Sequence, residues 1–334
     1  MPDLVTLGDI NIDIIARVPN YPPPGGDSLA ERVDVRAGGS AANTAIVLSK
    51  FGLDVSIIAS VGEDILADLA LSDLRQAGVD LTLVARGGES TTGLIFAAVT
   101  PDGERTFFSC RGANTRTVLQ PEAYQLIQGA KVLHISGYAL VEAPQRDAAL
   151  SAMEAAHRSG VPVSVDLGEE VMTSSREDLL KTLAMASTVF PNRTVAEWLT
   201  SERGAYQSVK TMLSQGTELV GLKLGSEGCL IGSTDGVFAV PEFPVIPVDD
   251  TGAGDSFDAG LLLGRLAGLS LRASGILANL LGAMATTVTG GGISLPGPVV
   301  AVPFLEERQG EATWQGWRKE MATVSEFLAK RPRV

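Results

Sequence analysis

Apolar runs alternate with amphipathic stretches along most of this 334-residue chain, and this alternation constrains its fold more than any other feature. Short apolar runs are typical of buried strands, and longer amphipathic stretches predict helices. Helices between successive strands imply an α/β fold, a mainly parallel central sheet with helices on both faces. The expected strands are 4–7, 55–61, 132–136, 161–166, 188–190 and 219–224. The expected helices are 41–50, 64–76, 121–128, 145–159, 176–185, 205–214 and two after Gly254, with Gly52, Gly78, Gly160 and Gly216 as C-terminal caps.

Two segments depart from the alternation. Residues 12–35 look strand-like but contain several prolines, and residues 94–100 and 105–109 form a hairpin pattern around a turn at 101–104. Neither has a helix to cover its second face, so we expect the two to pair into a small β-sheet lid that covers a cleft or forms a dimer edge. The predicted domains are a large α/β domain (1–11, 37–92 and 111–334) and a small β lid (12–36 and 93–110).

The charge balance restricts the partners. A net charge of −13 disfavours nucleic acid and anionic membranes, which both need a basic surface. The uncharged stretch 273–305 has a continuous apolar part only at 276–288, shorter than the roughly 20 residues of a membrane span. Two distant cysteines, Cys110 and Cys229, and an N-terminal segment without early basic residues indicate a reduced, cytoplasmic protein without a signal peptide.

The string VDDTGAGDSF at 248–257 opens an apolar helix with two glycines and a carboxylate. A helix start offers unpaired backbone N–H groups to an anion, and Gly252 and Gly254 allow its close approach. A carboxylate there hinders simple phosphate binding, but it suits removal of a proton from a hydroxyl while the backbone stabilises a transferred phosphoryl group. The string therefore predicts phosphoryl transfer with Asp255 as the base. The alternative is an ordinary helix start with an acidic first turn.

A second group of polar residues follows the first strand. Asn11 and Asp13 alternate with isoleucines, so both face one side at the carboxyl end of that strand, where ligands bind in open α/β sheets. The sequence AGGSAAN at 37–43 is another glycine turn that opens a helix. Carboxylate, amide and backbone N–H groups suit the hydroxyls of a sugar. Ordinary turn chemistry would explain either element alone equally well.

Together, these motifs resemble the ribokinase-like (PfkB) carbohydrate kinase family. The resemblance covers nearly the whole chain and depends most on GDINID at 8–13 and DDTGAGD at 249–255, with weaker matches at 112–114, 191–192 and 223–228. It implies phosphorylation of a sugar or nucleoside hydroxyl by ATP with Mg²⁺. The implied catalytic groups are Asp255 as base and the backbone of Gly252, Ala253 and Gly254 around the γ-phosphoryl group. The acceptor would be bound by Asn11, Asp13, Gly38, Gly39 and Asn43, with Arg105 reaching in from the lid.

The resemblance also implies a nucleotide site and a monovalent cation. The expected nucleotide residues are Asn192, Lys223, Gly225, Ser226, Gly228 and Asn279. The expected K⁺ residues are Asp249, Thr251, Ala285, Gly290 and Ser294, although helix capping accounts for Asp249 equally well. The chain departs from the family at Val195, where a glutamate associated with Mg²⁺ is usual. Either Glu197 replaces it from a shifted turn, or Mg²⁺ is held less tightly.

The acceptor stays open. Ser40 stands where many relatives that accept ribose or sugar phosphates carry lysine, which favours a neutral acceptor, whereas Arg105 and Arg111 would suit a sugar acid or a phosphate. Nucleosides stay possible through stacking on Phe107 and Phe108. Another alternative is a relative that binds sugar without catalysing a reaction, which would explain why Val195 replaces the usual glutamate. The sequence contains neither the phosphate loop G-x-x-x-x-G-K-[ST] nor a dinucleotide fingerprint after an early strand, which argues against P-loop enzymes and dehydrogenases.

Overall fold

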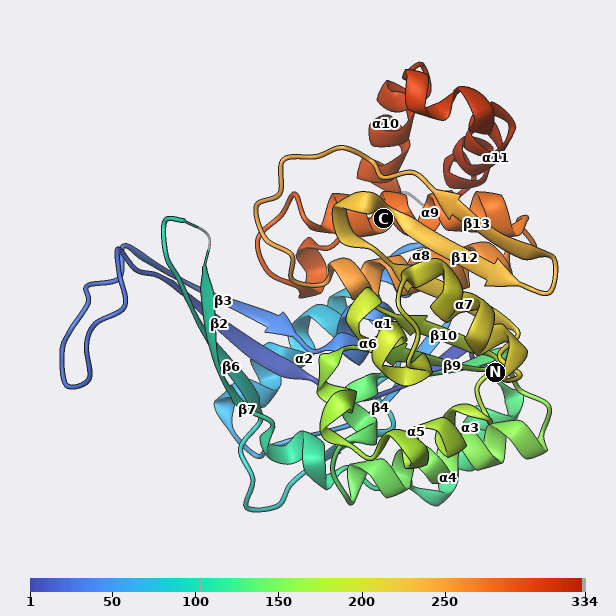
Figure 1. Ribbon diagram of the computed structural model, residues 1–334. Coiled ribbons are helices and arrows are strands. Elements are labelled where there is room, and N and C mark those ends of the chain that lie inside the picture. Colours follow the sequence, from blue (N-terminus) through green and yellow to red (C-terminus); the bar gives the residue numbers. More distant parts are fainter. Residues whose placement is uncertain (103, 332–334) are drawn as a thin grey trace.

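A nine-stranded, mostly parallel sheet forms the body of the computed structural model, which describes residues 1–102 and 104–331 (Figure 1). The strand order is β13-β12-β11-β10-β9-β8-β1-β4-β5. The strands are β1 (Leu4–Leu7), β4 (Val55–Val61), β5 (Val84–Arg86), β8 (Val132–Ile135), β9 (Val163–Leu167), β10 (Thr188–Pro191), β11 (Leu219–Lys223), β12 (Cys229–Ser233) and β13 (Gly236–Val240). Every pair from β11 to β5 is parallel, which confirms the predicted fold class.

Helices cover both faces of this sheet and divide its core into two clusters. Leu4 belongs to one cluster and Val5 to the other, because successive side chains of a strand point to opposite faces. The helices are α1 (Ser40–Lys50), α2 (Ile65–Ala77), α3 (Pro121–Gly129), α4 (Gln145–Arg158), α5 (Arg176–Leu183), α6 (Arg193–Thr200), α7 (Ala205–Ser214), α8 (Ala253–Leu266), α9 (Leu271–Ala285), α10 (Pro298–Arg308) and α11 (Arg318–Ala329). Short 3₁₀ segments are η1 (Gly112–Arg116), η2 (Gly137–Leu140), η3 (Glu169–Thr173), η4 (Gly225–Glu227), η5 (Gly292–Ser294) and η6 (Ala312–Trp317).

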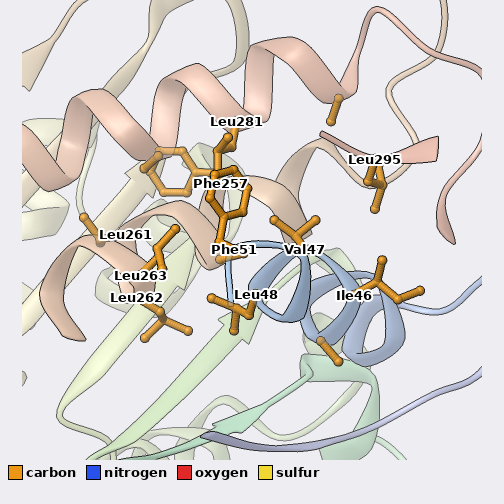
Figure 2. Packing of buried hydrophobic residues seen from close by; sticks show 14 of the residues in the cluster. Ile46, Val47, Leu48, Phe51, Phe257, Leu261, Leu262, Leu263, Leu281 and Leu295 are labelled. Carbon is orange, nitrogen blue, oxygen red and sulfur yellow. The ribbon is translucent and has the colours of Figure 1, made fainter. Parts of the chain in front are cut away.

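The core between α1, α8 and α9 fixes where the DDTGAGD string lies. Figure 2 shows Val47 of α1 and Phe51, which caps that helix, near Phe257 and Leu261 of α8, with Leu281 of α9 above them in this view. All five side chains are at least 95 % buried. Burying such side chains stabilises the fold by about 1.5–3 kcal/mol each. This packing anchors α8, so the position of its first turn is set by a rigid part of the molecule.

The two irregular segments form a separate four-stranded sheet, as expected. Its strand order is β3-β2-β6-β7, and this small sheet projects beside the main body (Figure 1). The strands are β2 (Asn11–Arg17), β3 (Arg32–Gly38), β6 (Gly93–Val99) and β7 (Arg105–Cys110). The expected turn at 101–104 includes Gly103, which lies outside the described residues. The division of the chain into two domains at the boundaries given above stays a prediction.

Several elements were not predicted because their local pattern is short or ambiguous. The antiparallel hairpin β12–β13 and the three-residue strand β5 have too few residues to show a period, and α6 spans eight residues. By contrast, the strand predicted at 55–61 and the helix predicted at 205–214 have the same bounds as β4 and α7. None of the helices in the described part of the chain combines the length and hydropathy that a bilayer span requires.

Candidate active site

Two cavities meet at the start of α8. The first, which we call the lid cavity, has a volume of about 420 Å³ and lies between β2, β7, the start of α1 and the first turn of α8. Its lining includes Asp9, Asn11, Asp13, Gly39, Ser40, Asn43, Arg111, Tyr138, Asp166, Glu170, Asn192, Lys223, Thr251, Gly252, Gly254 and Asp255. The carboxyl ends of β1 and β9 supply part of it, as expected for an open α/β sheet.

The second cavity, the α9 cavity, has a volume of about 650 Å³. It is lined by Lys223, Gly225, Ser226, Gly228, Phe243, Ala253, Gly254, Phe257, Asn279 and Thr286, among others. Lys223 and Gly254 line both cavities. The two spaces therefore adjoin at the start of α8, so a group bound in one lies next to a group bound in the other.

Asp255 faces the lid cavity from the first turn of α8 and is 9 % exposed. Its Oδ2 accepts a hydrogen bond of 2.7 Å from Nδ2 of Asn43, which comes from α1. Burial and the nearby Asp166 carboxylate raise the pKa of Asp255 to about 6. A carboxylate with a pKa near the working pH is suited to general-base catalysis. Asn43 and Asp255, which are 212 positions apart, are thus brought together.

The turn that precedes α8 is organised by Asp249. Its Oδ1 accepts hydrogen bonds from the backbone N–H and the hydroxyl of Thr251, and its Oδ2 accepts one from the N–H of Gly290. Burial alone would raise the pKa of Asp249, but these hydrogen bonds hold it below its usual value. Gly252 then caps α8 with a φ of 77°, a left-handed conformation that glycine adopts readily. Asp249 therefore shapes the backbone beside Asp255.

Asn11 and Asp13 lie side by side on β2 and both face the lid cavity, with Ile12 in the core on the other face. The Oδ1 atom of Asn11 accepts a hydrogen bond from Asn114. The Oδ1 atom of Asp13 is buried and has no hydrogen-bond partner among the described residues. Burial and the carboxylates of Asp249 and Asp255 raise the pKa of Asp13 to about 7.

The side chain of Asp13 explains why position 38 of the glycine turn is a glycine. A Cβ at this position would lie 2.3 Å from Oδ2 of Asp13, so only glycine leaves room for that carboxylate. Gly38 itself does not line the lid cavity, whereas Gly39 does. The glycine pair thus shapes the cavity in two ways, by admitting the side chain of Asp13 and by presenting its own backbone.

The chain as a whole was compared with known protein families and proteins. The family model described as "pfkB family carbohydrate kinase" matches residues 1–298. The chain belongs to this family. It is 32 % identical over 322 residues to Fructokinase-1 of Zea mays (91 % of this chain, 98 % of the relative). It is 30 % identical over 309 residues to the ATP-dependent ribose-1-phosphate kinase of Halopiger xanaduensis (92 % and 99 %).

The fold of this pfkB-family chain is also found in solved structures. A putative ribokinase II from E. coli, in complex with ATP and Mg²⁺, has a TM-score of 0.81 at 23 % identity over 92 % of this chain and all of that one. Members of the family are phosphotransferases, and this chain is a sugar or nucleoside kinase of the family.

The kinase has a buried ion network that the sequence analysis did not identify. Nζ of Lys223 lies 2.6 Å from Asp166 and 3.2 Å from Asp258, and the Asp258 side chain is fully buried. Burial would lower the pKa of Lys223, but the two carboxylates raise it. Burial raises the pKa of Asp258 well above its usual value, whereas Lys223 holds that of Asp166 below its usual value against the effect of burial. Asp166 is the penultimate residue of β9, at the carboxyl edge of the sheet, a position that could have identified it.

Arg111 and Arg105 are both engaged by carboxylates. Nε and Nη2 of Arg111 donate to the two oxygens of Asp9 at 3.0 and 2.9 Å, a bidentate contact at the edge of the lid cavity. Nη1 of Arg105 lies 3.1 Å from Oδ1 of Asp249. Arg105 does not line the lid cavity. The structure places its guanidinium against the turn before α8, and its contact with an acceptor stays a prediction.

The departure at Val195 also has a structural account. Val195 is fully buried, and its N–H donates to Oδ1 of Asn192, which caps α6 and faces the lid cavity. Glu197 accepts a hydrogen bond from the N–H of Gly204 at the start of α7. Arg193 forms an exposed ion pair with Glu227. Position 195 therefore offers no carboxylate, and Glu197 lines neither of the two cavities.

The expected nucleotide residues, apart from Asn192, line the α9 cavity. Nδ2 of Asn279 donates to the carbonyl oxygens of Val240 and Pro241, so its side chain fixes the segment after β13. Phe243 of that segment stacks on Trp314 with ring centroids 4.3 Å apart. The C-terminal helices therefore support one wall of this cavity. Ala285, Gly290 and Ser294 line neither cavity.

Proposed function

We propose that this kinase transfers the γ-phosphoryl group of ATP to a hydroxyl of a small sugar or nucleoside, with Asp255 as the general base. Asp255 takes the hydroxyl proton, the freed oxygen forms the new bond to phosphorus, and the bond to the leaving ADP oxygen breaks. The observation that carries this proposal is the contact of both cavities at Gly254 and Lys223, with Asp255 on the lid side.

The remaining roles follow from the lining of the cavities. The acceptor would lie in the lid cavity against Asn11, Asp13, Gly39 and Asn43. The nucleotide would lie in the α9 cavity, whose volume is within the range of about 300–1,000 Å³ that is usual for such ligands. The backbone N–H groups at the start of α8 would stabilise the negative charge on the transferred group.

Mg²⁺ fits this arrangement as an ion held mainly by the nucleotide phosphates. No group of three or more acidic, histidine or cysteine side chains that could hold a metal occurs within residues 1–102 and 104–331. Mg²⁺ commonly keeps several waters and uses only one or two protein carboxylates together with substrate phosphates. Val195 is buried, and Glu197 accepts a hydrogen bond from Gly204. We therefore favour the alternative in which Glu197 does not replace the usual glutamate and Mg²⁺ is held less tightly.

The carboxylate of Asp249, one of the residues expected to bind K⁺, is already engaged. Oδ1 of Asp249 already accepts two hydrogen bonds from Thr251, and its Oδ2 accepts one from Gly290. The guanidinium of Arg105 supplies a positive charge 3.1 Å from the same carboxylate. A cation would have to displace this charge, so we do not include K⁺ in the mechanism.

An ADP-release assay tests the proposed reaction. Pentoses, hexoses, sugar acids and nucleosides would be supplied with ATP and Mg²⁺, in potassium and in sodium buffers. Acceptor-dependent ADP release with formation of a phosphate ester would support the proposal, and K⁺ should not be required. Sugar binding without any turnover across the panel would favour the non-catalytic alternative.

The pH dependence of the reaction should report Asp255. Since the base must be ionised and its pKa is about 6, kcat/KM should fall about tenfold for each pH unit below 6 and level off above it. The profile is to be measured from pH 4.5 to 8, with circular dichroism at each pH to exclude acid unfolding. A flat profile between pH 5 and 7 in the folded enzyme would argue against this base.

We also propose that the lid sheet pairs two copies of the chain. Val33, Val35, Phe107 and Phe108 are between 41 and 62 % exposed, and β7 is an edge strand, with no further strand paired to it in the part of the chain that the structure describes. Exposed apolar edge strands are usually covered by a partner. Light scattering should give the mass of a dimer, and Phe107→Glu with Phe108→Glu should give a monomer. A monomeric wild-type protein at micromolar concentration would refute the proposal.

A further inference from the structure

Glu170 is a lid-cavity residue to which the mechanism above assigns no role. It lies in η3, directly after β9, and faces the cavity together with Asp166. Its Oε1 accepts a hydrogen bond of 3.1 Å from the N–H of Gly168. A Cβ at Gly168 or at Gly137 would lie within 2.4 Å of a Glu170 carboxylate oxygen, so the two glycines leave room for this side chain. The carboxylate is thus held in one place by the backbone around it.

Both basic side chains that line the lid cavity are bound by carboxylates, whereas several of its carboxyl groups have no basic partner among the described residues. Of its two basic side chains, Arg111 is bound by Asp9, and Lys223 is bound by Asp166 and Asp258. No basic side chain in the described ranges forms an ion pair with Asp13, Glu170 or Asp255, the remaining carboxyl groups of the cavity. Burial, and for Glu170 the neighbouring Asp166, raises the pKa of all three to between about 6 and 7. The raised pKa values show that the cavity disfavours negative charge, and an anionic ligand would add more of it.

The unpaired groups can still bind hydroxyls. Among residues 1–102 and 104–331, neither Oδ1 of Asp13 nor Nη1 of Arg111 has a hydrogen-bond partner, so these two lining residues supply an acceptor and a donor of hydrogen bonds. A hydroxyl serves either one. A phosphate or carboxylate would have to compete with Asp9 for Arg111, and it would lie near Glu170 and Asp13, which no cation neutralises.

We propose, on the basis of the function proposed above, that the lid cavity selects uncharged polyhydroxy acceptors over acceptors that carry a phosphate or carboxylate group, and that Glu170 is a specificity-determining residue for this choice. Specificity of this kind is a difference in affinity produced by a repulsive group in the site. When Glu170 is ionised, two unit charges about 6 Å apart at an effective dielectric constant of about 20 predict a discrimination of ~100-fold, so the comparison is made at a pH above the Glu170 pKa of about 7.

Matched acceptor pairs test the selectivity. Each pair joins an uncharged ketohexose or aldopentose with its phosphate monoester or its aldonic acid. For each compound, kcat/KM is measured by ADP release and the dissociation constant by calorimetry. We expect the uncharged member to be favoured by ~100-fold in both quantities. Equal or better use of the anionic member would overturn the selectivity while leaving the kinase function intact.

The role of Glu170 is tested with Glu170→Gln. The glutamine keeps the shape of the side chain and can still accept the hydrogen bond of Gly168, so the variant should fold. The preference for the uncharged member should narrow about tenfold or more. The control is Glu169→Gln, which removes an exposed carboxylate from the same 3₁₀ segment and should leave the preference unchanged. An unchanged preference in Glu170→Gln would remove Glu170 from the proposal.

Failure of the two proposals can be told apart. If no compound is phosphorylated, the proposed function fails, and the selectivity is then read from the dissociation constants alone. Measurable binding of the uncharged members with weaker binding of their anionic partners would support the selectivity. Comparable binding within pairs, or no binding of any uncharged member, would contradict it.

Discussion

Replacement of Asp255 by asparagine should lower kcat by about 10²- to 10⁴-fold, the usual contribution of a general base. The substitution removes the proton acceptor and keeps the shape of the side chain, and the amide oxygen can still accept the hydrogen bond from Asn43. The dissociation constant of the acceptor should therefore change little. Steady-state kinetics and calorimetry on the same preparation separate the two quantities.

The control for this variant is Asp147→Asn. Asp147 is an exposed carboxylate in the first turn of α4 and lines neither cavity, so its loss should leave kcat unchanged. A circular dichroism spectrum that matches the wild type would show that Asp255→Asn is folded. Turnover within a few-fold of the wild type in the folded variant would contradict the assignment of Asp255 as the base.

Replacement of Lys223 by methionine should reduce the free energy of unfolding by about 3–5 kcal/mol. The substitution keeps an apolar stem of similar length but leaves Asp166 and Asp258 without their shared cation. Removing one partner from a buried ion pair costs far more than the net worth of the pair, because the remaining charge stays buried. Urea unfolding monitored by tryptophan fluorescence measures the loss.

Two further variants show whether the buried charge is the cause. Adding Asp258→Asn to Lys223→Met removes one of the orphaned carboxylates and should recover part of the lost stability. Lys181→Met breaks an exposed pair with Glu177 and should change the free energy of unfolding by less than about 1 kcal/mol. Equal losses in Lys223→Met and Lys181→Met would mean that the buried ion network contributes no more to stability than an exposed ion pair.

The local pattern of the chain was sufficient for the body of the fold. Val55–Val61 is a run of seven buried residues, and a fully buried parallel strand requires such a run. Glycines at 52, 78, 160 and 216 have positive φ, as C-terminal caps require, and the helix expected to begin near Gly254, within the DDTGAGD string, begins at Ala253. The hairpin β12–β13 was missed, since five-residue strands with small residues show no clear period.

The candidate site was only partly predictable. Asp255, Asn11 and Asp13 were found because each follows a strand or opens a helix, and these positions are defined locally. Asp258 and Glu170 gave no such signal, and the position of Asp166 near the carboxyl end of β9 was not used. Their importance comes from Lys223 and from the carboxylates around them, which are distant in sequence.

The sequence by itself determined the α/β architecture, the separate lid sheet and the glycine turn that opens α8, because strand periods, glycine caps and helix starts depend on neighbouring residues. Tertiary structure decided which charges meet. It brought Asn43 to Asp255, Lys223 between Asp166 and Asp258, and Arg105 to Asp249. Electrostatic interactions depend on distance in space and on burial, and neither can be read from spacing along the chain.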